Sequence, residues 1–239
     1  MVKIFRNIRQ KLAAENKVMA YFRYAVGEIL LIVIGILIAL QINNWNEARK
    51  NKIEERTSLK QIKEDLLAEV ALLKGFNVYS KEELHYLNEI SNGNYNHVSI
   101  DSFFIKVAST LDFKSITIET KYYGLKSSGK LDLISNDSLK NKIMLFYENT
   151  HSFLETNINY NKEFVLKNIE APLVDILPLN KNLIVTDTNK TIDLLKSSNI
   201  ISKVNYQIFY YKRFEDTALQ IIKIIHGLIA DIDKELNSN

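Results

Sequence analysis

An unbroken apolar run near the N-terminus constrains this chain more than any other sequence feature. Every residue of Ile29–Leu40 is apolar or glycine. A helix rises about 1.5 Å per residue, so about 20 residues cross the core of a bilayer. The run with its flanks reaches this length, and Tyr24 and Trp45 place amphipathic rings where lipid headgroups would lie. We therefore predict one transmembrane helix over residues 24–45.

Two other interpretations of this run are a buried core helix of a soluble domain and a cleaved signal peptide. A core helix usually keeps a polar face, and Ile29–Leu40 has none. A signal peptide requires a cleavage site of small residues, whereas Leu40, Gln41 and Ile42 follow Ala39. An uncleaved signal anchor fits the sequence best.

The charges around the apolar run predict its orientation. The first 23 residues hold six lysines and arginines against one glutamate, whereas the whole chain has a net charge of +3. A cationic flank of a first apolar helix stays in the cytoplasm. We expect a cytoplasmic basic amphipathic segment over residues 1–23, which either contacts membrane lipid or forms a disordered tail, and an extracytoplasmic helical domain over residues 46–239. In a Gram-negative host, this orientation would place the protein in the bacterial inner membrane with its C-terminal domain in the periplasm.

Composition indicates that the extracytoplasmic part is helical. The chain has seven glycines, two prolines and no cysteine, so disulfides and thiolate metal sites are excluded and an apolar core must hold the fold. After the membrane segment, Leu59, Ile62, Leu66, Val70 and Leu73 recur at spacings of three and four. This stripe either joins two chains or packs into a bundle. We predict an all-α fold in which the transmembrane helix continues into a stalk and an antiparallel helical bundle follows.

Two positions predict where the stalk helix ends and the next helix begins. Gly75 is the first glycine after the membrane segment, and we expect it to end the helix. Ser80 and Glu83 have the spacing of a capping box, so a new helix would begin at Ser80. Further along, Gly129 is expected to stop a helix over residues 119–128.

Two long helices are predicted in the C-terminal half. One begins after Asn136 or Asp137, has Phe153 among its buried candidates, and ends near residue 169 before Pro172, which disfavours helix in the preceding residue. The other spans residues 200–236 on an apolar stripe. Charged residues interrupt that stripe, so a second membrane crossing is not expected.

Three residues of the membrane segment are candidates for a functional role. Glu28 is its one ionisable residue, and such residues often serve as proton or ion relays. The alternative is that Glu28 lies at the headgroup boundary, because it follows Tyr24 by only four residues. Gly35 and Ala39 form a small-xxx-small pair that permits close helix–helix packing.

No motif in the sequence predicts catalysis, and we expect no catalytic, cofactor-binding or metal site. None of the four histidines lies three or four residues from another, so no helical metal pair is present. Gly124–Leu131 approaches the phosphate-loop pattern but lacks the final hydroxyl that would hold magnesium. The pairs Tyr122–Tyr123 and Tyr210–Tyr211 could line a pocket, although core packing is the commoner role of such pairs.

Two stretches resemble an uncharacterised family of bacterial single-pass membrane proteins, a domain of unknown function. They are residues 5–50, with YAVGEI and QINNWNE, and residues 120–148, TKYYGLKSSGKLDLISNDSLKNKIMLFYE. The resemblance implies an N-terminal anchor and a helical ectodomain, and it implies no activity or catalytic residue.

These features together favour a membrane-anchored interaction or sensing protein that is not an enzyme. We expect it to form a homo-oligomer, to contact membrane lipid, and to bind an unknown protein partner or small ligand but no nucleic acid. The alternative function is a subunit of an ion- or proton-conducting membrane oligomer that uses Glu28.

Overall fold

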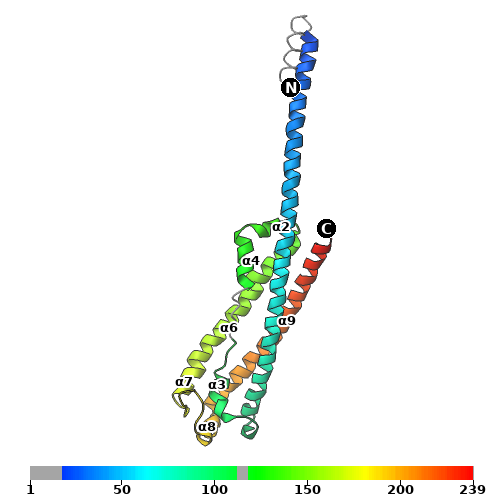
Figure 1. Ribbon diagram of the computed structural model, residues 1–239. Coiled ribbons are helices and arrows are strands. Elements are labelled where there is room, and N and C mark those ends of the chain that lie inside the picture. The colour runs from blue at the N-terminus through cyan, green and yellow to red at the C-terminus, as the bar shows by residue number, and fades with distance from the viewer. Residues whose placement is uncertain (1–17, 112–117, 239) are drawn as a thin grey trace. The chain divides into compact units, whose positions relative to one another are not determined.

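Figure 1 shows the computed structural model of the chain, which describes residues 18–111 and 118–238. The predicted N-terminal amphipathic segment falls almost entirely outside these residues. The chain forms two compact units, Met1–Glu54 and Glu55–Asn239. Helix α2, Val18–Ser91, contributes residues to both units.

The described residues are mainly helical and contain no β-strand, which confirms the all-α prediction. An isolated antiparallel bridge between Leu179 and Val185 is the nearest approach to a sheet among them. After α2 come the short 3-10 turns η1 (Tyr95–His97) and η2 (Ile100–Ser102), then α3 (Phe103–Val107), α4 (Ile118–Ser127), η3 (Lys130–Leu133), α5 (Asp137–Leu145), the π-helical turn η4 (Phe146–His151), α6 (Ser152–Val165), the π-helical turn η5 (Leu166–Glu170), α7 (Ala171–Val174), α8 (Thr188–Leu195) and α9 (Ser198–Asn237).

In the second unit, α9 runs antiparallel to α2. Residues of rising number along α2 meet residues of falling number along α9. Lys63 Nζ lies 2.5 Å from Asp233 Oδ1, and near the other end the Ser91 hydroxyl donates to Asn205 Oδ1 at 2.7 Å. The two helices therefore pair along much of their length, as Figure 1 shows for the second unit.

The helical rod from α5 to α7 runs parallel to α2, whereas α9 runs antiparallel to it. Glu55 Oε1 accepts a hydrogen bond from the backbone N–H of Ser135, directly before α5, at 2.7 Å. Farther along both helices, His151 Nε2 lies 3.7 Å from Glu69 Oε2. Because α2 and the rod are parallel, the chain between them must return to the end of the unit where α2 enters it. Helices α3 and α4 belong to this returning segment.

The apolar stripe of α2 packs into the core of the second unit. Leu59, Ile62, Leu66 and Leu73 are fully buried there, together with side chains from α5, α6 and α9. Of the two roles predicted for the stripe, the chain uses it for its own bundle. These side chains are therefore not available to join a second chain.

The prediction that Gly75 ends a helix was wrong, and so was the helix start at Ser80. Both residues lie inside α2, which continues to Ser91. A glycine inside a helix costs only about 1 kcal/mol relative to alanine. The buried positions continue in register beyond it, with Leu84 and Leu87 in the core, and their burial outweighs that cost.

The rod from α5 to α7 differs from prediction in two ways, and a π-helical turn explains the first. Phe153, predicted to be buried, is 58% exposed, whereas its neighbour Leu154 is buried. The π-helical turn η4 inserts an extra residue before them and shifts the buried face by one position.

The second difference is that the rod continues through Pro172 to Val174. Pro172 lies in the first turn of α7, directly after the π-helical turn η5. A proline is tolerated in a first turn because its missing N–H would have no intrahelical partner there.

Substituting Gly129 tests how the chain ends α4. Gly129 has φ 70° and follows the last turn of α4, as predicted for a helix stop. Gly129→Ala forces an L side chain into the left-handed region and should lower the free energy of unfolding by about 1 kcal/mol. The matched control is Gly124→Ala inside α4, where no atom obstructs a Cβ and helix propensity predicts a gain of about 0.5–1 kcal/mol. Denaturant midpoints that shift equally for both variants would contradict this reading.

Candidate functional site

The residues predicted from the membrane segment all lie on the first unit's part of α2. Glu28 is half-buried, Gly35 and Ala39 share one helix face, and Trp45 is exposed. The side chain of Tyr24 lies outside the described part of the structure. A Cβ at Gly35 would meet no atom within 4 Å. These residues are spread along one helix, so the described structure does not gather them into a site.

The same part of α2 is the one helix of the described residues that is long and apolar enough to cross a membrane. Its apolar side chains are exposed on every side, with Ile29 and Leu37 among the most exposed. A long apolar helix without burial differs from the core helix of a soluble domain, whose apolar face is covered. The long C-terminal helix α9 is not apolar enough over a sufficient length to cross a membrane.

A second feature, the α6–α9 groove, lies within the second unit. Helices α6 and α9 enclose a cavity of about 230 Å³ that opens at the surface. Apolar pockets with a few polar groups are the usual form of ligand sites. The lining residues are Phe153, Leu154, Asn157, Ile158 and Tyr160 of α6 and Tyr206, Phe209, Tyr210, Arg213, Phe214 and Thr217 of α9.

Contacts behind the groove hold its aromatic walls in place. Phe164 stacks on Tyr206 with ring centroids 4.1 Å apart and an interplanar angle of 26°. Phe214 meets Phe76 of α2 edge to face at 6.1 Å, so this wall residue is anchored to the core. Side chains locked in this way lose little freedom when a ligand binds, which favours binding.

The polar groups of the groove differ in whether they already have partners. The amide of Asn157 donates to the carbonyl of Phe153 at 2.7 Å, and the hydroxyl of Thr217 donates to the carbonyl of Arg213 at 2.9 Å. The hydroxyl of Tyr210 is buried and has no hydrogen-bond partner. Burial raises the pKa of Tyr210, so the hydroxyl keeps its proton at neutral pH.

A wider and more open cavity lies farther along α9, between this helix and α5. It has a volume of about 450 Å³, and apolar residues such as Leu145 and Ile224 line it. Its charged groups, Lys142 and Asp231, are already paired with each other at 2.6 Å. The two groups therefore satisfy each other, and this cavity offers a ligand less polar recognition than the α6–α9 groove.

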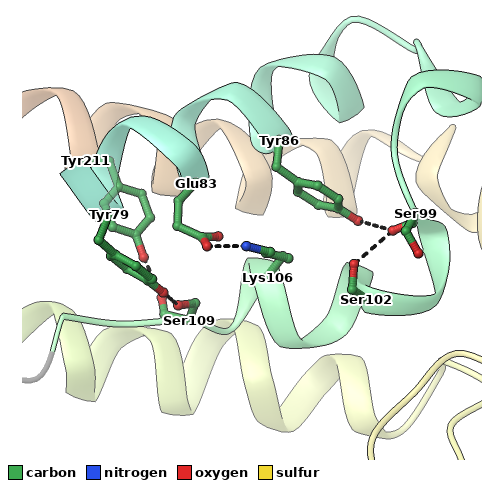
Figure 2. A network of polar contacts seen from close by, with 8 residues as sticks. All are labelled: Tyr79, Glu83, Tyr86, Ser99, Ser102, Lys106, Ser109 and Tyr211. Atoms are coloured by element: carbon green, nitrogen blue, oxygen red, sulfur yellow. Dashed lines mark hydrogen bonds and ion pairs between the residues drawn. The ribbon is translucent and has the colours of Figure 1, made fainter. Parts of the chain in front are cut away.

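A network of polar contacts joins α2, the α3 region and α9 (Figure 2). Glu83 is 1% exposed, and Lys106 Nζ lies 2.5 Å from its Oε1. The hydroxyl of Tyr86 donates to the carbonyl of Ser99 at 2.8 Å. On the α9 side, the hydroxyl of Tyr211 donates to the carbonyl of Ser109 at 3.1 Å. The network fixes the segment after α3 against both long helices.

In this network the pKa values of both charged residues, Glu83 and Lys106, are raised. Burial raises the pKa of Glu83, because a carboxylate without water is costly even beside a cation. The hydrogen bond to Glu83 raises the pKa of Lys106. The side chain of Glu83 is buried and that of Lys106 is partly exposed, and the pair joins α2 to α3 (Figure 2), which indicates a structural role.

A second buried polar cluster lies where α2 meets α4 and the π-helical turn η4. Asp65 Oδ1 lies 2.8 Å from Lys121 Nζ, and Glu69 faces His151 at 3.7 Å. The ring of Tyr147 stacks on Tyr122 beside them, with centroids 4.3 Å apart. Within residues 18–111 and 118–238, no three His, Cys, Asp or Glu side chains are grouped in a way that could hold a metal ion. We read this cluster as part of the core.

Sequence reasoning found the groove only in part. Tyr210 and Tyr211 were assigned either to a pocket or to the core, and the structure gives one role to each: Tyr211 is buried and Tyr210 lines the groove. Arg213 was not singled out, although an arginine within the aromatic run of residues 206–214 was a usable signal. Phe153 also lines the groove, having been assigned to the core.

Over residues 18–111 and 118–238 the fold is all-α, with one helix that could span a membrane. The chain belongs to the family described as "Family of unknown function (DUF6090)", whose pattern matches residues 28–170. This confirms the resemblance to a domain of unknown function. The match includes the apolar segment and α6 but ends before α9. Comparison with curated proteins and with solved structures gives no match.

Proposed function

We propose that this protein is a membrane-anchored interaction or sensing protein that binds without catalysing a reaction. Residues 24–45 anchor it in a bacterial inner membrane, with the N-terminus in the cytoplasm and the helical domain in the periplasm. The support for the anchor is the exposed apolar face of α2, and the support for the orientation is the cationic N-terminal flank. The chain acts as a homo-oligomer in this proposal.

The observation that carries the binding role is the α6–α9 groove. It combines fixed aromatic walls with a cation and a buried hydroxyl, and its mouth is open. Exposed aromatic side chains such as Phe153, Tyr160 and Phe209 are unfavourable in water unless a partner covers them. The conducting alternative stays a prediction from Glu28.

A thermal unfolding screen tests the binding role. The full chain in detergent is heated with a panel of small aromatic and aliphatic acids, amines and amides. A ligand of the native state at 100 times its Kd adds about 2.7 kcal/mol, which raises the Tm of a chain this long by about 5–10 °C. Phe209→Asp should abolish the shift because it places a charge in the groove wall.

The matched control for this screen is Leu219→Asp. Leu219 is exposed on the same helix and does not line the groove, so this variant should keep the full Tm shift. A panel without any shift, or a shift that Phe209→Asp retains, would show that the groove is not the binding site.

A further inference from the structure

We propose that the α6–α9 groove binds a small aromatic carboxylate, with its ring between the aromatic walls and its carboxylate on Arg213. This inference rests on the proposed binding function and names the class of ligand. It follows from three properties of the groove: its charge, its size and the shape of its walls.

The charge of the groove favours an anion. Arg213 is exposed, and no carboxylate pairs with its guanidinium among the described residues. Arginine is a planar cation that binds a carboxylate with two parallel hydrogen bonds. The guanidinium of Arg213 is therefore the group of the groove that recognises the anion.

The size of the groove favours a molecule with a single ring. Its volume of about 230 Å³ lies below the range of about 300–1,000 Å³ that is usual for pockets of drug-sized ligands. A partner helix is about 10–12 Å wide and would need a longer and wider trough. Tyr206, one of the lining residues, is held by its stack on Phe164.

The walls of the groove favour an aromatic ring over an alkyl chain. Phe153 and Tyr160 of α6 and Phe209 of α9 line the groove, and all three side chains are largely exposed. Aromatic pairs in offset or edge-to-face contact contribute about 0.5–1.5 kcal/mol beyond the burial of their area. A flat ligand ring can make several such contacts here at once.

Ligand-detected NMR titration of the full chain in detergent tests this inference with three probes of similar size. Phenylacetate has the ring and the charge, phenylacetamide has the ring alone, and octanoate has the charge alone. We expect phenylacetate to bind at least about tenfold more tightly than either of the others, because each lacks one of the two recognised groups.

Three substitutions assign the contacts. Arg213→Gln should weaken phenylacetate binding by about tenfold or more and leave phenylacetamide unchanged. Tyr210→Phe, which removes the buried hydroxyl alone, should leave phenylacetate binding unchanged, because this hydroxyl is not accessible to a ligand in the groove. Lys212→Gln is the matched control, since it removes one positive charge from the adjacent residue, which does not line the groove.

Each outcome decides for or against the inference. Equal binding of phenylacetate and phenylacetamide, tighter binding of octanoate, or an equal loss in Arg213→Gln and Lys212→Gln would overturn it. If none of the three probes binds while another compound of the panel shifts the Tm through the groove, the ligand class is wrong and the binding function stands. If nothing binds the groove, both are wrong.

Discussion

Lys106→Met is expected to lower the free energy of unfolding by about 3 kcal/mol, which for a chain of this length is a fall in Tm of about 6–12 °C. The variant removes the ammonium group and keeps most of the aliphatic stem. Glu83, which is almost fully buried, would lose the cation that lies 2.5 Å from its Oε1. Its other oxygen already has no hydrogen-bond partner. A buried carboxylate without a partner is among the most costly arrangements in a protein interior.

The double variant Lys106→Met/Glu83→Met separates this cause from a simple packing defect. With both charges gone, an apolar pair of similar shape should restore most of the lost stability. Lys81→Met is the surface control: its partner Glu215 lies 3.5 Å away and the lysine is largely exposed, so the expected change is below about 0.5 kcal/mol. A double variant as unstable as Lys106→Met would show that the ion pair is not the source of the loss.

The pH dependence of Lys106→Met gives a further check with a defined sign. Burial raises the pKa of Glu83 above its ordinary value of 4.5. A raised carboxyl pKa means that the folded state takes up its proton before the unfolded state as the pH falls. The stability deficit of Lys106→Met at neutral pH should therefore shrink as the pH falls towards 4.5. A deficit that grows over this range would contradict the assignment to Glu83.

The parts of the fold that sequence predicted well depend on local periodicity. The stripe of α2, the cap at Asn136 and the stop at Gly129 each involve residues close together in the chain. The end of α2 was misplaced because Gly75 has only a weak local preference against helix, whereas the buried side chains of α2 on both sides of it pack against distant helices. The helix propensity of one glycine amounts to about 1 kcal/mol. The sequence alone cannot compare it with the free energy of burial, because only the tertiary structure shows which side chains are buried.

The groove was harder to predict because it depends on how two helices pair. Periodicity indicates which face of α6 and of α9 is apolar, and does not indicate that the two faces leave a gap between them. Adjacent residues such as Tyr210 and Tyr211 point about 100° apart on a helix, so one enters the core and the other lines the groove. The π-helical turn η4 adds a register shift that the sequence pattern of Phe153 does not reveal.

Besides the loss of stability in Lys106→Met, a large effect is expected when charges are introduced into the membrane segment. The double variant Ile34→Arg/Leu37→Arg places two charges near the middle of the apolar run, where both native side chains are exposed. Each arginine at the centre of a spanning helix costs about 2.5–3.5 kcal/mol on insertion scales, so about 5–7 kcal/mol is lost in total. The native chain should stay in the membrane pellet after alkaline carbonate extraction, and the variant should be released or degraded.

Val78→Arg is the matched control, because Val78 is an exposed apolar residue of the same helix outside the predicted span. It should stay in the pellet as the native chain does. A reporter fused after Asn239 that is active only outside the cytoplasm reads the orientation in the same cells, and the cationic flank predicts activity in the native chain. A native chain that carbonate releases, or that is soluble without detergent, would require the exposed face of Ile29–Leu40 to be covered by protein rather than lipid, and the anchor would then be an interaction surface instead.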